Sequence, residues 1–470
     1  MTLNLDTLNT AINQVNDALW TYLLIGALIL CGLYFTIRTR FVQFTMIGDM
    51  FRQLIDASPA SEGKKHISSF QAFAVSVATR VGTGNLAGVA TAIAVGGPGA
   101  VFWMWVIALV GSATAFVEAT LAQLYKRPHS ESFIGGPAYY ILRGLHSKWM
   151  SALFAVLITL TFGLSYNSIQ SNTICDALHE AFGFNQVIVG AIISAVALFI
   201  VFGGIHRIAH VSSVVVPVMA IGYFILALVV VIMNIGLVPH VLKLIVVNAF
   251  GFEQVAGGGL GMTIMVGVKR GLFSNEAGEG SAPNVAATAH VSHPVKQGLI
   301  QALGVFTDTL LVCSCTAFMV LISGLYTTDD LQGIQLTQAS LQMQVGSWGT
   351  IFVAVAIFLF AFSSIIGNYY YGEANIRFLT DKKWVLTVFR VLSGGAFVFF
   401  GAVASFEFVW NLGDLFMALL TLCNLIALTF LCKYAFRLLN NYRDQKRRGI
   451  KDPVFKRSDL PEVADELDCW

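Results

Sequence analysis

Long apolar stretches separated by short polar connections make up most of this chain. A helix that crosses the hydrocarbon core of a bilayer needs about 20 predominantly apolar residues. Eleven stretches satisfy this requirement, two of them with an interruption, and their approximate limits are 19–37, 68–95, 99–124, 149–176, 186–203, 211–237, 256–290, 297–324, 347–374, 384–404 and 407–434. The pattern predicts an all-α polytopic membrane protein with 11 transmembrane helices.

Polar and flexible residues interrupt the second stretch. Arg80, Gly82, Thr83, Gly84 and Asn85 follow one another closely there. Each glycine weakens a helix by about 1 kcal/mol relative to alanine. Unwound backbone at membrane depth is tolerated only where its polar groups line a cavity or meet a ligand. We therefore expect a helix discontinuity over residues 80–86 that binds a polar ligand. The alternative is a glycine kink that serves helix packing.

A second interruption lies in the seventh stretch. Lys269, Arg270, Glu276 and Glu279 would be costly if they faced lipid, and several glycines and Pro283 stand among them. Interrupted segments at corresponding positions of two halves are the best sequence pointer to a transporter's binding site near the midplane of the membrane. Spans 2–6 and 7–11 then form two five-helix repeats, and the odd number of spans in each makes the second repeat inverted.

This 5+5 arrangement divides the chain into four parts. They are an N-terminal segment with the first transmembrane helix (1–67), the first repeat (68–240), the inverted second repeat (241–436) and a cytoplasmic tail (437–470). Lys and Arg accumulate in alternate connections, as cytoplasmic loops require. We expect the N-terminus outside, the C-terminus in the cytoplasm, and the chain in the cell (inner) membrane.

Composition excludes several other classes of protein. The chain is 56% hydrophobic and 11% charged, whereas soluble domains carry about 25% charged residues. A formal charge of +2 gives no reason to expect a nucleic-acid partner. The glycine-rich segment 96–99 lacks the Gly-Lys-Ser/Thr ending of a phosphate-binding loop, so we expect no nucleotide. The sequence shows no catalytic pair or metal-ligand cluster, and we expect no enzyme.

An interrupted helix offers two kinds of binding group. The N-terminus of its second half presents free N–H groups that suit a carboxylate, and the C-terminus of its first half presents free carbonyls that suit a cation or an ammonium group. The carbonyls from Ala78 to Val81 and the N–H groups of Thr83, Gly84 and Asn85 stand on the two sides of the first interruption. One break can therefore hold a zwitterion, which matches an α-amino acid.

The ninth stretch adds a cluster of oxygen atoms. Ser363 and Ser364, with the carbonyl of Phe360 one turn earlier, share a helix face. Hard cations prefer oxygen ligands, although paired serines in membrane helices also bond the carbonyl four residues back. Asn368 lies one turn beyond Ser364 and could reach a substrate side chain.

The fourth stretch is unusually polar at its centre. Asn167, Gln170 and Ser171 share one helix face; Gln170 is the candidate pocket residue, and hydrogen bonding between helices is the alternative.

Isolated acids raise a further question. Glu118, Asp308 and Glu373 lie in or near spans. They either pair with Arg80, Lys269 or Arg270 or relay protons, and we expect Arg80 to be a paired strut.

Four runs of sequence carry a family resemblance. RVGTGNLAG at 80–88, GGPGAVFWMW at 96–105, GLFSNEAG at 271–278 and YYGE at 370–373 resemble the alanine or glycine:cation symporter family, and the similarity covers roughly residues 20–440. The resemblance implies a sodium-coupled amino acid symporter with the leucine-transporter type fold and alternating access. Residues 82–86 also look like the Gly-Leu-Gly-Asn-Phe element of neurotransmitter:sodium symporters.

This resemblance implies roles for particular residues. The N–H groups of Thr83 and Gly84 would hold the substrate carboxylate, and Asn85 would line the pocket. The second break would close the pocket through Phe273, Ser274 and Asn275. Sodium would be held by Ala78, Val81, Phe360, Ser363 and Ser364.

One position departs from the family pattern. Members that carry alanine and glycine often have tryptophan where this chain has Asn368. Asparagine leaves more room and adds hydrogen-bonding capacity, so the substrate is a small neutral amino acid, either alanine or glycine or the larger glutamine. Na⁺ is the expected coupling ion and the lipid bilayer the expected surroundings. A proton-coupled transporter and a passive channel are the alternatives.

Overall fold

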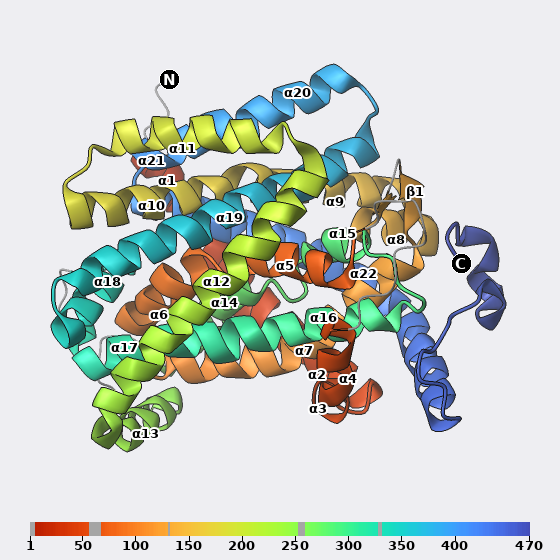
Figure 1. Cartoon of the computed structure of the whole chain (residues 1–470), viewed down its shortest axis with the longest axis horizontal. Coiled ribbons are helices and arrows are strands. Elements are labelled where there is room, and N and C mark those ends of the chain that lie inside the picture. Colours follow the sequence, from red (N-terminus) through yellow and green to blue (C-terminus); the bar gives the residue numbers. More distant parts are fainter. Residues whose placement is uncertain (1–4, 56–66, 130–131, 252–258, 328–330) are drawn as a thin grey trace.

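The computed structural model describes residues 5–55, 67–129, 132–251, 259–327 and 331–470. Figure 1 shows a bundle of long helices with shorter ones packed between them. In the described part, seven helices are long and apolar enough to cross a membrane, and an eighth span results if Pro217–Met233 and Ile235–Ala249, bent by 79°, are taken together. The chain is thus a helical multi-span membrane protein, as the sequence predicts.

The elements follow the predicted stretches closely. In the first part of the chain they are α1 (Leu5–Leu19), a π-helical turn (Trp20–Leu24), α2 (Ile25–Arg38), α3 (Val42–Thr45), α4 (Ile47–Ile55), α5 (Ser69–Arg80), a π-helical turn (Gly84–Gly88), α6 (Val89–Gly96), α7 (Ala100–Leu124), β1 (Arg127–His129), β2 (Ser132–Ile134), α8 (Pro137–Gly144), α9 (Lys148–Leu160), a π-helical turn (Thr161–Tyr166), α10 (Asn167–Phe182), α11 (Gln186–Val201), α12 (Gly204–Met233) and α13 (Val238–Ala249).

The second part contains the remaining helices, apart from two 3₁₀ turns at Ile235–Leu237 and Leu325–Thr327. They are α14 (Leu260–Asn275), α15 (Ala282–Ala286), α16 (Val295–Val305), a π-helical segment (Phe306–Cys313), α17 (Ser314–Ser323), α18 (Gly333–Val345), α19 (Trp348–Leu379), α20 (Lys383–Val391), a π-helical turn (Leu392–Ala396), α21 (Phe397–Val403) and α22 (Phe406–Arg447), followed by two short 3₁₀ helices, Arg457–Asp459 and Pro461–Glu466.

The first predicted discontinuity is confirmed. Helix α5 begins at a capping box, in which Ser68 Oγ accepts from the Gln71 N–H and Gln71 Oε1 accepts from the Ser68 N–H. It ends at Arg80, and the backbone of Val81 is extended, with φ −79° and ψ 94°. Helical structure resumes as a π-helical turn from Gly84. The α5 carbonyls and the N–H groups at the start of the following turn are therefore free of helical partners.

The second discontinuity is shorter than the predicted interruption, which also included Lys269 and Arg270. Helix α14 continues to Asn275, and Glu276 ends it in the left-handed region with φ 56°. Lys269 and Arg270 consequently lie inside a helix rather than in the break. The Arg270 guanidinium binds both carboxylate oxygens of Asp414 in α22, at 3.0 and 2.7 Å, and Lys269 Nζ lies 3.4 Å from Asp414 Oδ2. This buried ion pair explains why two cations are accepted in an apolar stretch.

One unbroken helix connects the interrupted segments to the rest of the bundle. Helix α19 packs against both α5 and α10, and Figure 1 shows it crossing the upper middle of the molecule, with α5 and α14 near the centre. Gly367 of α19 lies directly against Thr79 of α5. A Cβ atom at position 367 would overlap with Thr79 Cγ2. The close approach of α19 to the end of α5 places Ser363 and Ser364 beside the first break.

Two features were not anticipated from the sequence. Strands β1 and β2 form an antiparallel hairpin between α7 and α8, so the connection after α7 is not irregular throughout. Helix α22 runs on to Arg447, past the predicted start of the tail, and the residues after it fold back onto the end of the bundle. There the Phe455 N–H donates to Ser292 O at 2.9 Å, and Trp470 Nε1 donates to the carbonyl of Gln123 at 3.1 Å.

Candidate functional site

The two breaks are in direct contact with each other. A Cβ atom at Gly84 would lie 3.0 Å from Phe273 Cδ1 and 3.2 Å from the backbone Cα of Ser274. Such distances are tighter than ordinary van der Waals contact, so glycine is what allows the backbones to approach. The residues predicted to line one pocket from two separate helices therefore do meet at one place.

The end of α5 and the middle of α19 form a compact group of oxygen atoms. Ser364 Oγ donates to Ala78 O at 2.8 Å and lies 3.1 Å from Phe360 O and 3.5 Å from Val81 O. Ser363 Oγ donates to Phe360 O at 2.8 Å and lies 3.5 Å from Ala78 O. The structure thus brings all five predicted ion ligands together. Local bonding to the preceding turn accounts for the contacts with Phe360 but not for those that reach α5.

The predicted carboxylate-binding N–H group is occupied by a side chain. Gln170 Oε1 accepts from the Thr83 N–H at 3.0 Å and from Thr83 Oγ1 at 2.7 Å. A Cβ at Gly82 would lie 2.5 Å from Ser364 Oγ and 2.9 Å from Gln170 Oε1. Gln170 therefore lies at the break, as predicted, and its amide oxygen stands where one oxygen of a substrate carboxylate would accept the same bonds. A carboxylate bound there would have to displace it.

A buried carboxylate links the two breaks, and the sequence did not identify it as part of the site. Asp308 Oδ1 accepts from Asn85 Nδ2 at 2.6 Å, and its Oδ2 accepts from Ser274 Oγ at 2.6 Å and from Thr309 Oγ1 at 2.8 Å. Asn85 Oδ1 in turn accepts from the Gly82 N–H at 2.9 Å. Within the described ranges Asp308 has no ion pair. The sequence feature that could have identified Asp308 as a site residue is an acid between two threonines in an otherwise apolar stretch.

Asn368 and Asn275 differ in how their amide groups are bonded. Asn368 is 1% exposed, and neither its nitrogen nor its oxygen has a partner among the described residues. Buried polar atoms without partners are rare and costly, so this side chain is available for a ligand. Asn275 Oδ1 accepts from the Ala277 N–H at 3.0 Å and thereby caps the end of α14. Its Nδ2 has no partner in the same described part, and its role in a pocket stays a prediction.

Aromatic rings cover the site on one side. Phe273, which lies against Gly84, packs on Tyr166 and Trp410 with ring centroids 4.8 and 5.0 Å apart, and Trp410 packs on Phe406 at 5.5 Å. Beyond Phe406 lies a cavity of about 180 Å³, which polar residues of α10 and α18 help to line. Phe406 thus belongs both to the lining of this cavity and to the group of rings that reaches Phe273 beside the first break.

The isolated acids have different partners from those expected. Glu373 pairs with Arg377 and Arg390, so it is a structural ion pair, although with cations other than those proposed. Glu118 accepts from the Gly278 N–H at 3.3 Å and from an amide at 3.0 Å. Arg80 donates to Gln301 O at 3.2 Å and has no carboxylate within 4.0 Å in the described part of the chain. The expectation that Arg80 is a paired strut is therefore wrong.

Comparison with known proteins identifies the class. Residues 5–457 match the sodium:alanine symporter family. In fold, the chain is similar to the crystal structure of MhsT in complex with L-phenylalanine, with a TM-score of 0.57 and 13% identity over 87% of this chain and 94% of that one. The protein therefore belongs to the sodium:alanine symporter family and has a leucine-transporter type fold. It is a membrane transporter, not an enzyme.

Three similar members of the family come from Bacillus subtilis (strain 168). The probable sodium/glutamine symporter GlnT is 54% identical and aligns with 97% of this chain and 94% of its own length. The amino-acid carrier protein AlsT is 52% identical, with 98% and 97% aligned. The putative sodium/proton-dependent alanine carrier protein YrbD is 43% identical, with 94% of both aligned.

Replacing Ser364 with alanine tests the oxygen cluster. Loss of one polar group from a buried site costs about 1–3 kcal/mol, and 1.4 kcal/mol corresponds to about tenfold in binding. In Ser364→Ala we expect the Na⁺ concentration for half-maximal uptake to rise at least about tenfold, with substrate selectivity preserved. Ser194→Ala is a matched control, because Ser194 is also buried and bonds the carbonyls of Gly190 and Gly395 far from the breaks. An unchanged Na⁺ dependence in Ser364→Ala would contradict the assignment.

Proposed function

We propose that this protein imports a neutral amino acid together with Na⁺ by alternating access, and that glutamine is its preferred substrate. The observation that carries the proposal is the oxygen cluster formed across two helices by Ser364, Ala78 and Val81. Uncharged oxygens gathered beside a helix terminus suit a small hard cation. The names of the relatives at 54% and 43% identity, which refer to glutamine and alanine, agree with this substrate class.

Each part of a zwitterion has a complementary group at the breaks. The carboxylate binds the N–H groups of Thr83 and Gly84 once Gln170 has moved away, because these groups begin a helical turn and carry partial positive charge. Na⁺ lies beside it among Ala78, Val81, Phe360, Ser363 and Ser364. The ammonium group is held by free carbonyls of the unwound backbone. Asp308 keeps Asn85 and Ser274 at fixed positions around the pocket.

The substrate preference rests on Asn368. Its buried amide has one acceptor and two donors without partners among the described residues. A methyl side chain, as in alanine, would leave these atoms unpaired, whereas the carboxamide of glutamine can pair with them. Leaving a buried polar group unpaired costs about 1–3 kcal/mol, which is enough to favour glutamine over alanine by about tenfold or more.

The finer topology is part of the same proposal. The N-terminal segment 1–67 precedes two inverted five-helix repeats, 68–240 and 241–436, and the segment 437–470 lies in the cytoplasm. This gives 11 spans in the inner membrane with the N-terminus outside. The two interrupted helices, α5–α6 and α14–α15, support it because they begin the two repeats and meet at one place. Their halves are too short to count as spans on their own.

Proton coupling is the second candidate. One relative is named as a sodium/proton-dependent carrier. Asp308, Glu118 and Glu279 are fully buried and have no ion pair within 4.0 Å in the described part of the chain, so they are the candidates for carrying a proton. In this version the same pocket is used, but a proton accompanies or replaces Na⁺.

Uptake into proteoliposomes distinguishes Na⁺ coupling from proton coupling. With an inward Na⁺ gradient and equal pH on both sides, we expect glutamine to accumulate against its concentration gradient, because the ion and the substrate share one break. An inward proton gradient without Na⁺ should give no accumulation. Uptake that follows the pH gradient and ignores Na⁺ would replace Na⁺ coupling with proton coupling. Downhill equilibration that does not saturate would indicate a channel.

Asn368→Trp tests the placement of the substrate side chain. Overfilling a packed site costs about 1–3 kcal/mol, so we expect glutamine uptake to fall at least about tenfold while alanine and glycine uptake change less than about threefold. Competition by unlabelled amino acids against labelled alanine measures the change for glutamine and the change for the smaller substrates. If all substrates lost uptake equally in a variant that elutes as intact protein, Asn368 would not lie at the side-chain end of the pocket.

A further inference from the structure

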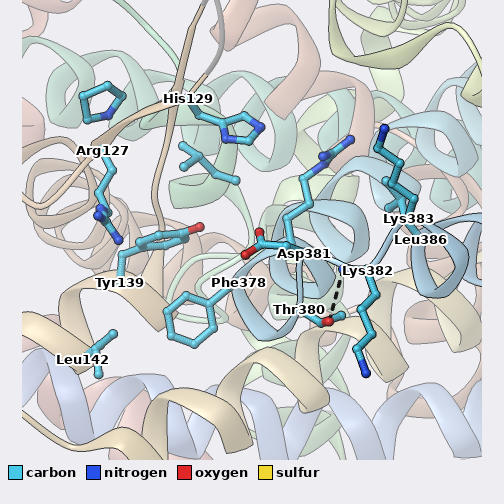
Figure 2. A pocket seen from close by; sticks show the side chains of 13 residues that line it. Arg127, His129, Tyr139, Leu142, Phe378, Thr380, Asp381, Lys382, Lys383 and Leu386 are labelled. Carbon is cyan, nitrogen blue, oxygen red and sulfur yellow. Dashed lines mark hydrogen bonds between the residues drawn. The ribbon is translucent and has the colours of Figure 1, made fainter.

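A second cavity lies away from the breaks, at one end of the bundle. It has a volume of about 440 Å³. One wall comes from the β1–β2 hairpin and α8, and the other from the connection between α19 and α20 (Figure 2). The proposed orientation puts this end in the cytoplasm. The lining residues that carry polar groups are Arg127, His129, Tyr139, Arg377, Thr380, Asp381, Lys382 and Lys383.

Cations dominate this lining. Arg127 and Arg377 are already paired, with Asp468 at 3.0 Å and with Glu373 at 2.6 Å. Lys382 and Lys383 have no carboxylate within 4.0 Å in the part of the chain that the structure describes, so their charge is available to a ligand. A phosphate group is the ligand that a cavity with several Lys and Arg side chains suits best.

Neutral donors complete the anion-binding side. His129, Tyr139 and Thr380 face the cavity, and the hydroxyl of Tyr139 is directed toward it from α8 (Figure 2). Burial lowers the pKa of His129, and the neighbouring Arg377 lowers it further. The lowered pKa favours the neutral imidazole, which offers a hydrogen bond rather than a charge.

A single carboxylate is also part of the lining. Asp381 is exposed and points toward the cavity opposite Tyr139 (Figure 2). It has no cationic partner within 4.0 Å among the residues described. A carboxylate repels a purely anionic ligand but attracts an ammonium group on the same ligand. The lining is thus complementary to a molecule that carries both a phosphate and a primary amine.

The position of the cavity favours a membrane source for such a molecule. Lys383 begins the spanning helix Lys383–Val403, and the next residue, Trp384, is 65% exposed. Exposed tryptophans next to lysines at the end of a spanning helix are typical of the lipid headgroup level. Phe378 and Leu386 add apolar surface to the lining, against which the glycerol end of a lipid can pack.

We propose that this cavity binds a phosphoethanolamine group, supplied by the headgroup of a phosphatidylethanolamine lipid. His129 and Tyr139 donate to the phosphate, Lys382 and Lys383, whose side chains point in opposite directions in Figure 2, compensate its charge from the other wall, and Asp381 holds the ammonium group. The bound headgroup contacts the hairpin and α8 from one side and the α19–α20 connection from the other. It therefore stabilises conformations in which these two connections stay close.

Thermal unfolding of the delipidated full chain in detergent tests the site, because a ligand that binds only the folded state raises the unfolding temperature. We expect phosphatidylethanolamine to raise the apparent melting temperature by about 2–4 °C. Phosphatidylglycerol, which lacks the amine, and phosphatidylcholine, whose quaternary ammonium has no N–H, should raise it less. If soluble phosphoethanolamine alone reproduces the full shift, the site stands and its ligand comes from solution.

Two variants separate the two halves of the proposal. The double variant Lys382→Gln, Lys383→Gln should abolish the melting-temperature shift for every lipid. The control is the double variant Arg448→Gln, Lys451→Gln, which removes the same charge from exposed positions after α22 and should leave the shift unchanged. Asp381→Asn should reduce the phosphatidylethanolamine shift to that of phosphatidylglycerol. The proposal is overturned if wild type shows no lipid shift, if both lysine pairs behave alike, or if Asp381→Asn keeps the full preference for phosphatidylethanolamine. None of these readouts depends on transport.

Discussion

Unpaired peptide groups inside a membrane protein are the constraint from which the rest of this structure follows. Helix α5 stops at Arg80, and the backbone turns extended at Val81 before a new helical turn begins. Without water, each such group needs a partner within the protein or on a ligand. The structure provides partners from distant parts of the chain: Ser364 for the carbonyls, and Gln170 for the Thr83 N–H.

These partners are the kind that a ligand can replace. A serine hydroxyl that donates to a carbonyl can turn its oxygen toward a cation, and the amide oxygen of Gln170 can leave the Thr83 N–H to a carboxylate. By contrast, the helix that leads into the second break is held by contacts that a ligand cannot easily replace, namely the ion pair between Arg270 and Asp414 and the cap formed by Asn275. In the proposed mechanism, the first broken helix therefore exchanges its partners for ligands, and the second serves as a fixed wall.

Much of this arrangement could be predicted because its signals are local. Glycines and polar residues inside an apolar stretch identify a break, and Ser363 and Ser364 share a face by helical geometry alone. The contacts that depend on packing between distant helices could not be predicted. Asp308 meets Asn85 and Ser274 only because three helices converge. The helical position of Lys269 and Arg270 could not be predicted for the same reason, because Asp414, the partner that stabilises these cations within α14, is far away in sequence.

The most direct test removes the space on which the first break depends. A Cβ at Gly82 would lie 2.5 Å from Ser364 Oγ and 2.9 Å from Gln170 Oε1, whereas one at Gly222 would meet nothing within 4 Å. The decisive measurement is equilibrium binding of labelled glutamine to purified Gly82→Ala and Gly222→Ala, with and without Na⁺. Our account predicts that Gly222→Ala binds as wild type and that Gly82→Ala, although folded, loses Na⁺-dependent binding. Wild-type binding by Gly82→Ala would contradict it.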